Sequence, residues 1–361
     1  MNKRHGVELV VGLSLVIASG AGCDDGGTAD PGPPPADLRV DGNYEIVSTY
    51  DLTAGAVLPD PVATYAQEIV GLRNDPAGTM FKLLDDAGVP LASDLMDALP
   101  GPVADQLKGA INDFFAADVY GNARVSGELD TLSAALQTVL ARPDVVSQLS
   151  LAAPDATGAT TATHRLAELR YHLYGGATEI AVPIATPAGA AAVLTLQTSA
   201  TARVTRGTAG EDAHLKVGDH AFGVPYGTYV LAALDQAMEQ RYGTDLRGAL
   251  GALVDCDAMA ASVAGKCVLG ACIGHQPTLA AICDDGLDLA VRQMTDRIRA
   301  LRFDALRQSG QARMWDAATP GGASDRVIDR LATGNWAASV DFGMGPRNVA
   351  ATFAGARATG R

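Results

Sequence analysis

Residues 169–174 read Leu-Arg-Tyr-His-Leu-Tyr, in which apolar Leu169, Tyr171 and Leu173 are separated by polar side chains. A β-strand points successive side chains to opposite faces, so this period of two predicts a strand with one buried and one polar face. Antiparallel sheets commonly pack one face on a core and leave the other in solvent. The stretch therefore favours an antiparallel sheet as the centre of the fold.

The same alternation recurs on both sides of this stretch and predicts further strands. The stretches concerned are 43–52, 213–217, 220–224, 311–315, 335–342 and 349–353. The uncharged window 180–202 is broken by Pro183 and Pro187, so residues 180–206 are predicted to form a hairpin rather than a membrane helix.

Apolar residues recur at three- and four-residue spacing elsewhere, which predicts amphipathic helices. These stretches are 62–73, 91–99, 103–115, 129–140, 230–238, 246–253 and 287–301. Helices and strands come in blocks rather than in βαβ alternation. We therefore expect an α+β fold over residues 38–361, in which a curved antiparallel β meander packs with several amphipathic helices, with a candidate subdivision at the 153–163 loop.

The N-terminus has the pattern of an export signal. Lys3 and Arg4 precede an apolar run at 7–18, and small residues stand directly before Cys23. This arrangement resembles the lipobox of bacterial lipoproteins. The resemblance implies that a signal peptide, residues 1–22, is removed, that Cys23 carries a diacylglyceryl and palmitate-type lipid, and that the chain is anchored in the cell envelope.

Residues 24–37 consist largely of Gly, Asp and Pro, which predicts a disordered tether after the acylated Cys23. The whole chain has 27 basic and 41 acidic residues, a formal net charge of −14. Nucleic-acid binding needs a positively charged surface, and this excess of acidic residues argues against one. We therefore expect no nucleic-acid partner. The expected partners are the membrane, through the lipid, and an apolar ligand or an envelope protein.

Four further cysteines lie close together, at Cys256, Cys267, Cys272 and Cys283. In an exported chain an even, clustered set predicts two disulfides, for which three connectivities exist. The nested pairing, Cys256 with Cys283 and Cys267 with Cys272, would close a helical hairpin. The alternative is zinc with His275 as a further ligand, but a second pair of closely spaced ligands is missing, so we expect no metal.

The sequence contains no G-x-S-x-G, H-E-x-x-H, P-loop or dinucleotide-binding motif, so we assign no catalytic residue and no cofactor. His214 and His220 bracket a predicted strand–turn–strand and could meet across it, with an acid, as a hydrolase or metal site. The ordinary interpretation is a solvated hairpin end. Asp284, Asp285 and Asp288 are interpreted as the start of a helix, where acidic residues suit the helix dipole.

Three functions remain from these observations. The first is a non-catalytic binding module for an apolar ligand or lipid, anchored in the envelope. The alternative is a structural or assembly lipoprotein that binds an envelope protein, and the least favoured is a hydrolase. No motif distinguishes the first two.

Overall fold

The computed structural model describes residues 32–53, 57–59, 78, 82, 101–114, 116–117, 123–184, 195–207, 212–265, 267–268, 271–272, 275–316 and 325–358. The expected signal peptide, Cys23 and the helices expected at 62–73 and 91–99 lie outside the residues described by the structure. Within the described residues, no helix combines the length and hydropathy needed to cross a membrane.

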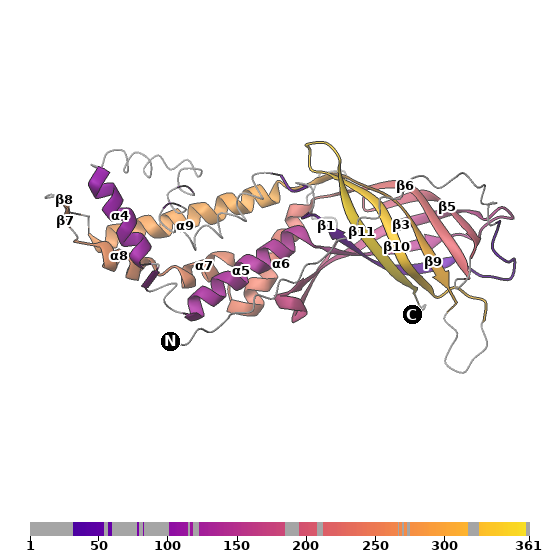
Figure 1. The fold of residues 1–361 in the computed structure, drawn as a ribbon, viewed down its shortest axis with the longest axis horizontal. Coiled ribbons are helices and arrows are strands. Elements are labelled where there is room, and N and C mark those ends of the chain that lie inside the picture. The colour runs from indigo at the N-terminus through magenta and orange to yellow at the C-terminus, as the bar shows by residue number, and fades with distance from the viewer. Residues whose placement is uncertain are drawn as a thin grey trace, which may run out of the picture. The chain divides into compact units, whose positions relative to one another are not determined.

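Nine long strands form one antiparallel sheet, in the order β2-β1-β11-β10-β9-β6-β5-β3-β4 (Figure 1). The strands are β1 (Gly42–Asp51), β2 (Asp144–Leu151), β3 (Ala159–Leu173), β4 (Thr178–Pro183), β5 (Gln197–Arg206), β6 (Ala213–Val224), β9 (Phe303–Trp315), β10 (Arg330–Asp341) and β11 (Arg347–Arg357). The additional pairing of β2 with β3 closes eight of them into a barrel, with β4 outside the ring.

The closed barrel corrects the expected α+β fold of a meander packed with helices. In an open sheet the buried face needs helices to cover it, whereas in a barrel the same face turns inward and covers itself. The closure depends on pairs such as Val145 with Leu169, which join β2 to β3. Alternation along single strands is identical in the two architectures, so the pattern did not distinguish them.

The inward positions of the strands are filled with large side chains. Tyr44, Ile46, Tyr171, Phe222 and Leu149 are almost completely buried there. Eight strands give an interior just wide enough for side chains to fill, which matches this packing. The barrel interior described here is therefore a hydrophobic core rather than a container.

The helices are α4 (Gly101–Phe114), α5 (Ala123–Ala141), α6 (Tyr226–Tyr242), α7 (Leu246–Leu253), α8 (Cys256–Val263) and α9 (Gln276–Arg299). Buried residues of α5, α6, α7 and the C-terminal part of α9 belong to the same continuous core cluster as the strands. Gly227 in α6 allows a close crossing with α9, because a Cβ there would meet the carbonyl oxygen of Ile298 at 1.6 Å.

The local expectations had mixed outcomes. Strands at 43–52, 335–342 and 349–353 are confirmed as β1, β10 and β11. The expected hairpin at 180–206 is wrong in its pairing, because β4 and β5 both pair with β3 instead of with each other. The two short strands expected at 213–217 and 220–224 are one strand, β6, with a bulge. The loop expected at 153–163 is shorter than predicted, because β3 already begins at Ala159.

Candidate functional site

A group of polar side chains lies inside the barrel, where most of the other inward positions are apolar. Ser147 on β2, His164 on β3, His220 on β6 and Gln308 on β9 are each at most 6 % exposed. A buried polar side chain costs free energy unless it is hydrogen-bonded. Each of these four residues has a hydrogen-bond partner, and we call the group the interior network.

The hydrogen bonds of the interior network run in one direction. His220 Nδ1 lies 2.9 Å from the carbonyl oxygen of Gly218, which can only accept, so this nitrogen carries the proton and Nε2 is the acceptor. His164 Nδ1 donates to His220 Nε2 over 2.9 Å, which leaves His164 Nε2 to accept from the Ser147 hydroxyl at 2.8 Å. The tautomers follow from this network rather than from observed hydrogens.

Gln308 connects the histidines to the opposite wall of the barrel. Its Nε2 donates to His220 Nε2 over 3.0 Å, and its Oε1 accepts from the Tyr50 hydroxyl on β1. On the same wall, Trp336 Nε1 donates to Ser48 Oγ over 3.0 Å. With these bonds, every ring nitrogen of the two histidines has a hydrogen-bond partner, and no proton is assigned to two hydrogen bonds.

Aromatic rings enclose the two imidazoles. Trp336 stacks on His164 with ring centroids 5.6 Å apart, and Phe222 lies edge-on to both histidines at 5.1 and 5.5 Å. Desolvation by burial lowers the pKa of His164 to about 3, and the neighbouring His220 adds to this by like-charge repulsion. Burial also lowers the pKa of His220, partly opposed by its bond to Gly218. Both imidazoles are neutral at pH 7.

Ser147 and His164 have the separation of a nucleophile and its general base. Ser147 is 2 % exposed and His164 is 1 % exposed, so a substrate has no access to the hydroxyl in this closed barrel. A base with so low a pKa is also weak at neutral pH. The pair therefore contributes to the structure and gives no support for hydrolysis.

The expected meeting of His214 and His220 is wrong. Their strand is continuous through the bulge, and His214 lies on the outer face next to Arg313 while His220 lies inside. Ser147, His164 and Gln308 were not singled out from the sequence. A signal for Gln308 exists, because it occupies an inward position between Leu306 and Gly310 where apolar or small residues are expected.

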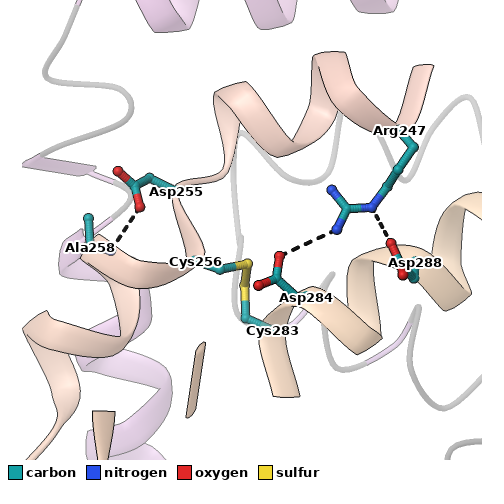
Figure 2. Close-up of a disulfide and its surroundings, with 7 residues drawn as sticks. All are labelled: Arg247, Asp255, Cys256, Ala258, Cys283, Asp284 and Asp288. Atoms are coloured by element: carbon teal, nitrogen blue, oxygen red, sulfur yellow. Dashed lines mark hydrogen bonds and ion pairs between the residues drawn. A yellow bond between two sulfur atoms is a disulfide. The ribbon is translucent and has the colours of Figure 1, made fainter. Parts of the chain in front are cut away.

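A second candidate site is the segment closed by a disulfide. We call residues 255–288 the stapled segment; it comprises α8, the short pair β7 (Cys267–Val268) and β8 (Ala271–Cys272), and the first half of α9. A disulfide joins Cys256 to Cys283, with a Cα–Cα distance of 5.6 Å (Figure 2). This is the outer bridge of the nested connectivity.

For Cys267 and Cys272 the structure describes only the backbone register, which places the two residues opposite each other on β7 and β8. Opposite residues of an antiparallel pair are close enough for a disulfide. The second bridge therefore stays a prediction, and a mass measurement of the alkylated chain tests it.

Ion pairs add to the disulfide on the α7 side. Arg247 of α7 binds Asp284 at 3.3 Å and also binds Asp288, both on α9 (Figure 2). The hydrogen bond from Arg247 holds the pKa of Asp288 below its ordinary value. The interpretation of these acidic residues as a helix start is wrong, because α9 begins two turns earlier at Gln276.

The stapled segment has its own small apolar contacts. Cys256, Met259, Ala260, Ala280 and Cys283 are buried but lie outside the continuous core cluster. Ile282, next to Cys283 in the sequence, is 53 % exposed and is one of two exposed large apolar side chains in the described residues. The segment therefore combines covalent rigidity with an accessible apolar side chain.

A hollow of about 660 Å³ lies over β6, β9, β10 and β11. Its exposed members include Arg307, Ala337 and Asn348, which occupy outward positions of their strands, while the inward-facing His220 and Gln308 of the interior network also line it. The lining combines polar side chains with small apolar ones. It therefore does not resemble the apolar pocket expected for a lipid.

The part of the chain that the structure describes contains no cluster of three or more His, Cys, Asp or Glu residues suited to a metal ion. No protein-family model, curated protein or solved structure matches this chain.

Proposed function

We propose that this protein is a non-catalytic, lipid-anchored envelope protein whose stapled segment binds a protein partner. The observation that supports the proposal most strongly is the exposed Ile282 beside the Cys256–Cys283 disulfide. Contiguous exposed apolar patches mark interaction surfaces, and the proposal places Ile282 in such a patch on this rigid element.

The rigidity of the segment supports the same proposal. A helical pair with few core contacts would fluctuate, and ordering it on binding would cost affinity. The disulfide and the Arg247 ion pairs reduce that cost by holding α8 and α9 together before a partner arrives. A disulfide also fits an oxidising, exported environment.

The anchor supplies the location in this proposal. Cys23 carries the lipid, and the residues after it form the tether. The last part of that stretch contacts the barrel, since the carbonyl oxygen of Gly32 accepts from the Arg206 N–H over 2.9 Å and Asp37 pairs with Arg326 at 3.0 Å. At Gly32 and Asp37 the C-terminal part of the predicted tether is therefore bound to the folded part of the chain.

A site-specific photo-crosslinker tests the proposal directly. We expect a crosslinker at position 282 of the full chain, in cells that produce it, to yield a discrete protein adduct. The matched control places the crosslinker at Thr352, which is exposed on the outer face of β11. Adducts of equal yield at both positions, or none at 282, would contradict the proposal.

The apolar ligand stays a prediction. The described side chains fill the barrel interior, so such a ligand would have to lie elsewhere on the molecule. Native mass spectrometry of the purified chain distinguishes the two functions. Extra mass of a few hundred daltons that organic extraction removes favours the ligand, while a bare chain leaves the protein partner.

A further inference from the structure

The His164–His220 pair is the one part of the interior network that can change its charge near neutral pH. In the neutral state three protons serve three bonds: Ser147 to His164, His164 to His220, and His220 to the Gly218 carbonyl. The nitrogens His164 Nδ1 and His220 Nε2 are 2.9 Å apart and share a single proton. The hydrogen bond between the two imidazoles therefore exists only while one of these nitrogens is unprotonated.

The groups that face the pair come from five strands, and none of them is a carboxylate. Ser48 and Tyr50 lie on β1, Ser147 on β2, Phe222 beside His220 on β6, Gln308 on β9 and Trp336 on β10. Tyr50 is titratable, but burial raises the pKa of its hydroxyl, so it remains neutral and uncharged. Asp219, which is exposed at the bulge, has an electrostatic effect that opposes the lowering of the His220 pKa.

Adding protons to the closed barrel is unfavourable in two stages. A first proton on His164 can be accepted by reorienting the Ser147 hydroxyl, but it leaves a buried positive charge without a counter-ion. A second proton places two N–H groups face to face across the 2.9 Å gap, which breaks the bond between the rings. The rings must then separate, and Trp336 and Phe222 pack directly against them.

We propose that the His164–His220 pair is an acid-sensitive latch inside the barrel, which holds β3, β6 and β9 together at neutral pH and releases them when the pair takes up protons. The released state is a loosened barrel in which the imidazoles reach water. Because the latch lies in the barrel, it acts independently of the partner surface proposed for the stapled segment.

The direction of the effect follows from linkage. In the unfolded or loosened state both histidines have an ordinary pKa near 6.5, while burial lowers both pKa values in the closed barrel, to about 3 for His164. Between these values the open state binds more protons than the closed one. The latch therefore contributes its full stability above pH 6.5 and loses it progressively as the pH falls.

Urea unfolding of the full chain between pH 7.5 and 5.0 measures this loss. Two extra protons raise the unfolding equilibrium constant by up to about 100-fold per pH unit below pH 6, since each proton contributes about tenfold. The Trp315→Phe variant retains Trp336 as its single tryptophan, so its fluorescence reports on the ring stacked against His164.

His220→Gln is the informative variant, because an amide can donate to Gly218 and accept from His164 but does not titrate. We expect it to reduce the pH dependence to about tenfold per unit, for one remaining histidine. The matched control is His275→Gln, which removes an exposed histidine and is expected to keep the wild-type slope.

A wild-type unfolding constant that is independent of pH between 6.5 and 5.0 would overturn the proposal. So would a His220→Gln variant that keeps the full wild-type slope. If that variant does not fold, the wild-type protein still tests the proposal. A steep pH dependence of its unfolding constant, with a Trp336 fluorescence change in the same pH range, supports the latch. An unfolding constant that does not change with pH rejects it.

Discussion

The barrel and the stapled segment are stabilised by different means. In the barrel, backbone ladders closed by β2–β3 surround a filled interior, and the polar side chains of the interior network have hydrogen-bond partners there. In the stapled segment, a few small buried residues are supplemented by a disulfide and surface ion pairs. The difference indicates that the barrel is held by its core, while the stapled segment depends on its covalent link.

That contrast also separates the functional proposals. The filled, closed interior has no space for a substrate or lipid, so it does not support catalysis or ligand binding inside the barrel. The stapled segment uses rigidity that its small core does not provide, which is expected of a surface kept ready for contact. The predictions below test the contrast in order of decreasing effect.

The largest effect is expected from Trp336→Ala in the barrel. Trp336 stacks on Phe353 with centroids 4.1 Å apart and is 4 % exposed, so its removal leaves a cavity and frees Ser48 from its donor. We expect a loss of about 3–5 kcal/mol in the free energy of unfolding, measured with urea. The neighbouring exposed Asn335→Ala should change it by less than about 0.5 kcal/mol. Equal effects would remove the distinction between the two faces of β10.

Removal of the disulfide should act only locally. In Cys256→Ala/Cys283→Ala, which opens a bridge of sequence separation 27, we expect α8 and the start of α9 to lose about 2–4 kcal/mol of local stability. Amide hydrogen exchange measures this, with β9 and β10 expected to remain unchanged. The matched variant Cys267→Ala/Cys272→Ala spans a much shorter loop and should have a smaller effect. A parallel loss in β9 would argue against separate stabilisation.

Substitution of glycine by alanine should have opposite effects on stability at an inward position of β9 and at an open position of α5. A Cβ at Gly310 on β9 would lie 2.2 Å from the Trp336 ring, so Gly310→Ala is expected to destabilise the barrel by about 1–3 kcal/mol. Gly127 in α5 has open space around it, and Gly127→Ala should stabilise by about 0.5–1 kcal/mol through helix propensity. Thermal unfolding of both variants measures these changes in stability. A Gly310→Ala variant as stable as the wild type would mean that the interior can rearrange around the new methyl group.

The smallest effect concerns the first turn of α8. Asp255 accepts a hydrogen bond from the Ala258 N–H at 2.9 Å as its N-cap (Figure 2). Asp255→Ala should lower the local stability of α8 by about 1 kcal/mol, measured by exchange of its amides, whereas Asp255→Asn retains the cap. Identical exchange in the two variants would show that the cap is not needed once the disulfide is closed.

The sequence predicted local structure well wherever one strand or helix carried its own pattern. Alternation at Trp336, Ala338 and Val340 identified β10, and the clustering of the cysteines predicted disulfides, with Cys256–Cys283 as one of the pairings left open. Closure was not predictable, because it depends on β2 meeting β3, and an inward-facing strand has the same pattern in an open sheet.

The interior network was harder still to predict. The bulge between Val217 and His220 turns His220 inward while His214 stays outside, and an inserted residue of this kind cannot be read from alternation. His164 and Ser147 meet only because the barrel closes. The missed residues are therefore those whose positions depend on pairing between distant strands.

Native-state hydrogen exchange of the full chain, with the disulfide intact and then reduced, tests the central contrast most directly. We predict that reduction accelerates exchange in α8 and the first half of α9, while amides of β1, β3 and β10 keep their protection. If the strands lose protection together with the helices, the two regions form one cooperative unit, and the account of a self-supporting barrel with a separately stapled surface is contradicted.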